Sequence, residues 1–235
     1  ICDREEEINA FIPEEYWTLD AQLHVHGSRK KLTAHYYGDK DGRKAIHSKE
    51  EVEALMKRLE GCEYEVRDVK LGERVKKAPI PFTTSTLQQE ASKTLNFSTQ
   101  KTMRLAQQLY EGVDIKGRGT IGLITYLRTD STRIADEADA MAREYINSNY
   151  GEKYVLQNEQ ARKSSAKIQD AHEAIRPTDI TLTPAMAKES LSRDQFRLYQ
   201  LIWRRFTASR MQSAIYETTS VKIGAGEYTF TVAAS

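Results

Sequence analysis

The order in which the hydrophobic periodicity changes along the chain constrains its fold most strongly. Apolar and polar residues alternate from Trp17 to Val25 and again from Tyr228 to Ala233, with the period of two that is typical of half-buried strands. From Thr84 to Met211 the pattern is mainly helical. This order predicts an α+β fold, in which an inserted, mainly helical domain interrupts a strand-rich domain whose two halves pair with each other.

The same pattern suggests where the domains begin and end. We expect residues 1–15 to be the end of a truncated helix from a domain outside the chain, because the chain starts without Met. Residues 16–83 and 212–235 would form the discontinuous strand-rich domain, and residues 84–211 the inserted helical domain. The spacing of helices and a short strand in that insert suits a helix-turn-helix or winged-helix arrangement, although many small helical domains share it.

Capping residues predict where several helices start. A serine followed three residues later by Glu or Gln forms a capping box at Ser48/Glu51, Ser85/Gln88 and Ser192/Gln195. Ser98 and Thr183 are further N-caps, whereas Ala135 precedes a helix without a capping side chain. Four glycines predict a loop from Gly112 to Gly122, and weak patterning predicts a mobile or variable loop over residues 151–169.

Composition narrows the class of protein. Of the 235 residues, 29% are charged and 39% are hydrophobic, as in globular proteins, and no apolar run is long enough to cross a membrane. The cysteines, Cys2 and Cys62, are too few for a disulfide framework or a zinc site, so we expect a reducing cytoplasm. The net charge of +1 does not by itself predict nucleic-acid binding.

The distribution of charge is more informative than its sum. Basic residues gather in a stretch without acidic residues, at Arg197, Arg204, Arg205 and Arg210. Others flank the segment Gly122–Thr132: Lys93, Lys101, Arg104, Lys116, Arg118, Arg128 and Arg133. Local basic faces of this kind can follow a phosphate backbone, but a solvated surface of mixed charge explains them equally well.

Chemically versatile side chains concentrate in the segment Gly122–Thr132. Its apolar start predicts a short buried strand, which then presents Tyr126, Arg128 and Asp130. Polar groups at the end of a rigid strand suit a functional site. The alternative is that Tyr126 is a half-buried core phenol and that residues 130–132 cap a helix.

A second segment, Asp170–Thr178, combines an imidazole, carboxylates, a guanidinium and a proline. An ion-paired loop is one interpretation. The other joins His172 to Tyr126 and Arg128, because a guanidinium favours the phenolate and binds phosphate oxygens, while an imidazole can assist proton transfer. Tyr, Arg and His together suit attack of a tyrosine on a phosphodiester, which stores the bond energy as a phosphotyrosine and needs no ATP.

Longer motifs resemble those of a known family, bacterial DNA topoisomerase I, which is the type IA family. The matching segments are Pro81–Gln89, Gly122–Thr132, Asp170–Thr178 and the N-terminal run Ile1–Glu5. The resemblance covers essentially the whole chain. Leu127 between Tyr126 and Arg128, and the run Glu-Ala-Ile-Arg-Pro after His172, are more similar to topoisomerase I than to topoisomerase III or reverse gyrase.

The resemblance implies a role for individual residues. Tyr126 falls on the family's nucleophile, which forms a 5′-phosphotyrosine and leaves a 3′-hydroxyl. Arg128 falls on the arginine that contacts the scissile phosphate, and His172 on the site histidine. Supporting roles are expected for Asp130, Glu173 and Arg176, and DNA contacts for Arg128, Arg133, Lys101 and Arg104.

The resemblance also implies what lies outside the chain. The strand-rich domain would be the arch that lets the tyrosine-bearing domain swing open, while the Toprim domain, which binds Mg²⁺, is absent. We therefore expect no metal or cofactor in this chain, single-stranded DNA and the Toprim domain as partners, a monomer, and no relaxation of supercoils by the chain alone. The alternatives are a non-catalytic single-stranded-DNA-binding module, with Tyr199 and Trp203 stacking on bases beside Arg204, and a structural domain without nucleic-acid affinity. The spacing of these two aromatic residues favours packing in a helix core over stacking.

Overall fold

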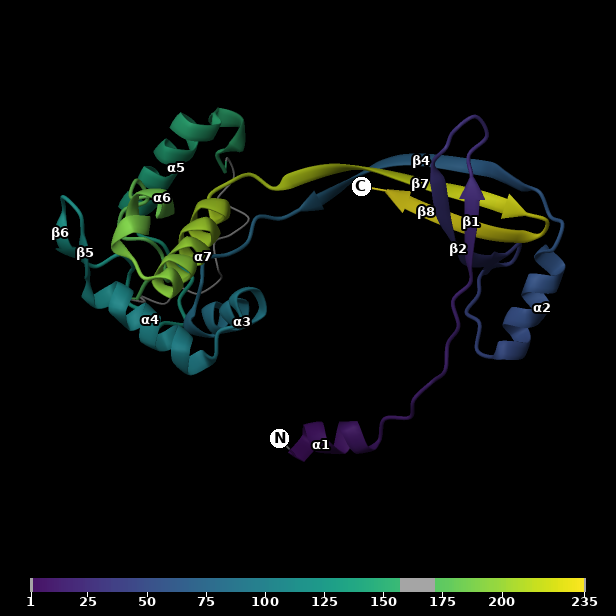
Figure 1. The fold of residues 1–235 in the computed structure, drawn as a ribbon, viewed down its shortest axis with the longest axis horizontal. Helices are drawn as coiled ribbons and strands as arrows, with labels where there is room; N and C mark the ends of the chain where they lie inside the picture. Colours follow the sequence, from purple (N-terminus) through teal and green to yellow (C-terminus); the bar gives the residue numbers. More distant parts are fainter. Residues whose placement is uncertain (1, 157–171, 235) are drawn as a thin grey trace. The chain divides into compact units, whose positions relative to one another are not determined.

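The computed structural model describes residues 2–156 and 172–234, and the chain divides into two compact units (Figure 1). One unit comprises residues 1–74 and 215–235, and the other comprises residues 75–214. The chain enters the second unit through strand β4 (Tyr64–Lys76) and leaves it through strand β7 (Ala214–Ala225). Among the described residues, no helix has both the length and the apolar character needed to cross a bilayer.

The first unit is built on an antiparallel sheet. Its further elements are α1 (Cys2–Asn9), β1 (Asp20–His24), β2 (Lys31–Asp39), β3 (Gly42–Arg43), α2 (Lys49–Leu59) and β8 (Tyr228–Ala234). The strand order is β1-β2-β8-β7-β4, with β3 beside β2. Strands from the two ends of the sequence therefore pair, as the periodicity predicts, and β2 runs antiparallel to β8 through Tyr36 opposite Phe230.

Burial in this unit follows the alternation of β1 and of the first residues of β8. Ala34 of β2 and Phe230 of β8 are completely buried, and Tyr36 packs edge-on against Phe230 with ring centroids 5.8 Å apart. Gly226, with φ of 58°, makes the turn between β7 and β8, a left-handed conformation that favours glycine. Helix α2 starts at the predicted cap, where the Ser48 side chain accepts a hydrogen bond from the Glu51 N–H.

The second unit is mainly helical. Its elements are α3 (Thr84–Leu95), α4 (Thr99–Glu111), β5 (Val113–Ile115), β6 (Gly119–Ile121), α5 (Asp136–Tyr150), η1 (Glu152–Tyr154), α6 (Pro184–Ala187), η3 (Lys188–Ser190) and α7 (Arg193–Ser209). Helices α3 and α4 pack on each other and on α7 (Figure 1). The apolar face of α7 lies in the core through Leu198, Ile202 and Phe206, which are at most 2% exposed.

Most of the predicted helix starts are correct, but one capping box is wrong. Ser98, Thr183 and Ser192 cap α4, α6 and α7 as expected, and α5 starts at Ala135 without a side-chain cap. Helix α3 begins two residues earlier than the predicted Ser85/Gln88 box, at a box formed by Thr83 and Thr86. Four consecutive hydroxyl residues, Thr83 to Thr86, make the register of such a cap ambiguous in the sequence.

Two further expectations are corrected. The glycine-rich stretch contains a hairpin, because β5 pairs with β6 and places Val113 opposite Ile121. The segment around Tyr126 is no regular strand, and Ile124 makes only an isolated bridge with Pro177. Of the predicted loop over residues 151–169, residues 157–169 lie outside the described part, whereas Val155 forms a bridge with Met211.

Candidate active site

Tyr126 lies in an extended segment in which exposed and buried residues alternate. Leu127 and Thr129 are buried, with exposed fractions of 1% and 8%, and Tyr126, Arg128 and Asp130 are exposed. The two buried side chains fix the segment in the core of the helical unit. The three polar side chains are thereby turned to solvent, and the phenol of Tyr126 is 45% exposed.

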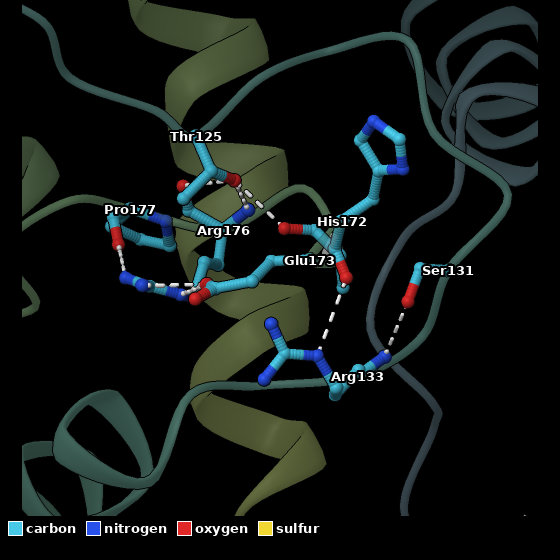
Figure 2. A network of polar contacts seen from close by, with 8 residues as sticks. Thr125, Ser131, Arg133, His172, Glu173, Arg176 and Pro177 are labelled. Carbon is cyan, nitrogen blue, oxygen red and sulfur yellow. Dashed lines mark hydrogen bonds and ion pairs between the residues drawn. The ribbon is translucent and has the colours of Figure 1, made fainter. Parts of the chain in front are cut away.

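The hydroxyl of Thr125 joins this segment to the one that carries His172 (Figure 2). It donates to the Ala174 carbonyl at 2.7 Å and accepts from the Arg176 N–H at 3.0 Å. The Thr125 N–H donates in turn to the Arg176 carbonyl at 2.9 Å. The hydroxyl and the N–H of Thr125 thus replace the main-chain hydrogen bonds that would otherwise join two strands, and they connect segments that are distant in the sequence.

His172 is exposed at the start of this second segment. Its carbonyl accepts from Arg133 Nε at 3.4 Å, and the Ala174 N–H donates to the Arg133 carbonyl at 2.8 Å. In Figure 2 the imidazole points away from the ion pair of Glu173 and Arg176. The backbone that follows the imidazole is therefore held, while the ring itself is presented at the surface.

A hollow of about 400 Å³ brings three of the predicted site residues together. Its lining consists of Thr84, Ser85, Arg128, Thr129, Asp130 and His172. Thr84 and Ser85 open α3, and the N-terminus of a helix carries partial positive charge. Within the described residues no carboxylate forms an ion pair with Arg128, so its guanidinium is available to an anion. The hollow combines the donors that a phosphate requires.

Tyr126 is not among the residues that line this hollow, and its ring packs on that of another tyrosine, Tyr110, at the end of α4. The two rings meet at 67°, with centroids 5.5 Å apart. The backbones are equally close, because the Leu123 N–H donates to the Leu109 carbonyl at 2.7 Å. Tyr110 thus restricts the orientations that the exposed phenol of Tyr126 can adopt.

Glu173 and Arg176 form a largely buried ion pair rather than part of the exposed surface. Glu173 Oε2 accepts from Arg176 at 2.7 Å, and the side chains are 22% and 13% exposed. Arg176 also donates to the Pro177 carbonyl at 3.0 Å. The pair fixes the turn that follows His172, so its contribution to the site is structural support.

Ion pairs neutralise several of the basic residues that the sequence places near the site. Lys101 pairs with Asp194 at 2.6 Å, and its ammonium also lies over the ring of Phe97. Similar pairs join Lys116 to Glu189, Arg118 to Asp179 and Arg210 to Asp139. Arg104 is exposed on α4. The positive charge of the surface near the site is therefore weaker than the number of Lys and Arg residues in the sequence indicates.

The aromatic residues considered for base stacking are in the core. Tyr199 is completely buried and Trp203 is 8% exposed. Their polar groups donate to main-chain carbonyls, the Tyr199 hydroxyl to Leu182 at 2.7 Å and the Trp203 indole to Ile180 at 2.9 Å. Burial raises the pKa of the Tyr199 hydroxyl. These two side chains therefore pack in the helix core, as their spacing favours, and are not exposed for base stacking.

The described residues do not fit a Mg²⁺ site. No group of three or more His, Cys, Asp or Glu side chains in that part of the chain is placed to hold a metal ion. Asp130 supplies a carboxylate to the hollow, next to the guanidinium of Arg128. Asp170, the first residue of the predicted His172 segment, lies outside the described residues.

Sequence reasoning did not identify two residues that shape the site, Thr84 and Tyr110. Thr84 contacts the segment of Arg128 from 43 residues away in the sequence. The sequence pattern places Tyr110 on the apolar face of α4, whereas in the structure it is 39% exposed. No sequence pattern around either residue predicts its role, since both act through tertiary contacts.

Comparison with known proteins gives a consistent result. A family model described as DNA topoisomerase matches residues 1–235. The chain is also similar to full-length topoisomerase I from Thermotoga maritima, with 40% identity and a TM-score of 0.74. That match covers 99% of this chain and 36% of the Thermotoga chain. The chain therefore belongs to the bacterial type IA DNA topoisomerase family.

Proposed function

We propose that this chain supplies the nucleophile for an ATP-independent, type IA topoisomerase reaction on single-stranded DNA. The phenol oxygen of Tyr126 attacks the phosphorus of a phosphodiester, and the bond from phosphorus to the 3′-oxygen breaks. The phenol loses its proton, and the leaving 3′-oxygen gains one. The products are a 5′-phosphotyrosine and a free 3′-hydroxyl, so the energy of the ester bond is conserved for religation.

One observation carries this proposal: an exposed phenol lies two residues from a guanidinium that has no ion pair with the described residues, on a segment that is tied to the one carrying His172. Arg128 can neutralise the phosphate and orient it through two parallel hydrogen bonds. The N-terminus of α3, which supplies Thr84 and Ser85 to the lining of the hollow, adds positive potential there. The imidazole of His172 can hold a phosphate oxygen or relay a proton.

Strand passage requires more of the polypeptide than this chain. The chain spans 36% of the Thermotoga protein to which it is similar. We propose that a Toprim domain outside it binds Mg²⁺, and that the complete monomer relaxes negative supercoils in the cytoplasm. Consistent with this division, the chain alone should show no turnover in a relaxation assay that contains Mg²⁺.

The nucleophile can be tested against a matched neighbour. Tyr110 is exposed to a similar extent, 39% against 45%, and its ring touches that of Tyr126. In the full-length enzyme, Tyr126→Phe should abolish the covalent adduct with a single-stranded oligonucleotide. Tyr110→Phe, which keeps the ring, should retain it. An adduct that persists in Tyr126→Phe would exclude this tyrosine as the nucleophile.

A substitution of Arg128 distinguishes a catalytic role from simple binding of single-stranded DNA. Replacing it with alanine should slow adduct formation and lower the slope of log affinity against log salt for single-stranded DNA by about 1, because one phosphate contact is lost. Arg193→Ala, at the start of α7, serves as a control for an exposed arginine outside the hollow. Binding whose salt slope is unchanged in Arg128→Ala would favour the non-catalytic binding module.

A further inference from the structure

We propose that Thr84 is a positioning residue that fixes the backbone of Arg128, and through it the direction of the guanidinium. This inference rests on the proposed function, in which Arg128 binds the phosphate under attack. Thr84 belongs to α3, and Arg128 follows it by more than 40 residues, so only the tertiary structure relates them.

The hydroxyl of Thr84 bonds to the peptide groups on both sides of Arg128. It accepts from the Thr129 N–H at 2.9 Å and donates to the Leu127 carbonyl at 2.7 Å. The Thr129 carbonyl, at 3.1 Å, is a second acceptor for the same hydroxyl. These are the N–H that follows Arg128 and the carbonyl that precedes it, so one side chain restrains both backbone dihedrals of the arginine.

The main chain of Thr84 reinforces this hold. Its N–H donates to the Thr129 carbonyl at 2.9 Å, which makes a short ladder between the first residue of α3 and the segment of Arg128. The helix is itself rigidly placed, because Leu87 and Ala91 are completely buried. Arg128 is therefore positioned by a fixed helix terminus and not by a flexible loop.

The hydroxyl of Thr84 satisfies both the Leu127 carbonyl and the Thr129 N–H. A hydroxyl group is at once a donor and an acceptor, whereas the nearly isosteric valine is neither. The groups that it would leave unpaired are enclosed, since Leu127 is 1% and Thr129 is 8% exposed. Thr84→Val would therefore release the backbone of Arg128 to find other partners, and the guanidinium would move with it.

The test is a double-mutant cycle on the rate of adduct formation by the full-length enzyme. Thr84→Val should slow the reaction by about tenfold to a hundredfold, the scale expected when a reacting group is displaced by roughly 1 Å. Thr84→Ser, which keeps the hydroxyl, should stay within about threefold of the parent. In an Arg128→Lys background, Thr84→Val should cost less than about threefold, because a flexible ammonium does not depend on the direction of a planar fork. Equal losses in both backgrounds would overturn the proposal.

A matched control separates positioning from general stability. Thr102 is also buried, in α4 of the same unit, and its hydroxyl donates to the Ser98 carbonyl at 2.9 Å. Thr102→Val should lower the melting temperature but leave the adduct rate near that of the parent. If Thr102→Val slows the reaction as much as Thr84→Val does, the effect of Thr84 is one of stability and the proposal fails.

Hydrogen exchange tests the contact without any variant. The Thr129 amide should exchange slowly in the folded parent protein, since its hydrogen bond is buried and made to α3. Free exchange of that amide would also refute the positioning role, even if Thr84→Val does not fold. The proposed function fails separately, if Tyr126→Phe retains the adduct.

Discussion

Replacing Asp139 with asparagine should destabilise the helical unit strongly. The carboxylate accepts from Arg143 Nε at 2.5 Å and from Arg210 at 2.7 Å, which ties α5 to the end of α7. The side chains of Asp139, Arg143 and Arg210 are 15%, 27% and 12% exposed. Removing one partner from a buried charge cluster costs about 3–5 kcal/mol. Because some exposure remains, we expect a loss of about 3 kcal/mol in the free energy of unfolding.

The pH dependence of the stability difference between the parent and Asp139→Asn provides a second test of this prediction. Burial alone would raise the pKa of Asp139, but the hydrogen bonds from Arg210 and Arg143 outweigh it and hold the pKa below the ordinary value of 3.8. A carboxyl whose pKa is lower in the folded state adds stability above its ordinary pKa, and that stability is lost as the pH falls through the folded pKa. The parent should therefore lose its advantage over Asp139→Asn in acid.

The assay is urea unfolding at pH 7 and in acid, followed by tryptophan fluorescence. Trp17 and Trp203 are the two tryptophans of the chain, so a Trp17→Phe background makes Trp203 report on the helical unit. Asp194→Asn is the control, because its partnership with Lys101 is more exposed and its loss should be much smaller. Equal effects of the two substitutions, or a difference from the parent that persists in acid, would refute the reasoning.

Three further substitutions test local features of the helical unit by thermal melting. Ala135→Ser should raise stability by about 0.5–1 kcal/mol, since Ala135 has N-cap geometry without a side-chain bond; no gain would mean that the start of α5 is capped otherwise. Gly122→Ala should cost about 1–3 kcal/mol and slow adduct formation, because its Cβ would lie 2.6 Å from the Tyr110 carbonyl; a neutral result would contradict that close approach. Glu173→Gln should cost about 2 kcal/mol through the loss of its ion pair with Arg176, and an unchanged melting temperature would show that the pair is not structural.

The sequence predicts the sheet and most of the helices because their signals are local. Alternation in β1 and β8, and hydroxyl caps such as Ser98 and Ser192, depend on residues within one element. The pairing of the two chain ends also follows, since each strand-rich end needs a partner to cover its apolar face. The hairpin of β5 and β6 is missed because its strands are only three residues long.

The arrangement of the site is harder to predict because it depends on long-range contacts. Residue types alone point to Tyr126, Arg128 and His172 as candidates for the site. The segment that carries Tyr126 differs from the predicted strand because its main chain bonds to the hydroxyl of Thr84 and to the Arg176 carbonyl, and its Thr125 hydroxyl accepts from the Arg176 N–H. Such contacts leave no periodicity in the sequence.

The central claim, that Tyr126 forms a covalent bond to the 5′ phosphate of cleaved DNA, can be tested by mapping the adduct. Trypsin cleaves the chain so that Tyr126 lies in the peptide Gly119–Arg128, and Tyr110 in the separate peptide Leu105–Lys116. With the full-length enzyme and an end-labelled oligonucleotide, a 3′-terminal label should remain on the protein, and mass spectrometry should find the nucleotide on Gly119–Arg128. A nucleotide on another peptide, or retention of a 5′-terminal label instead, would contradict the account.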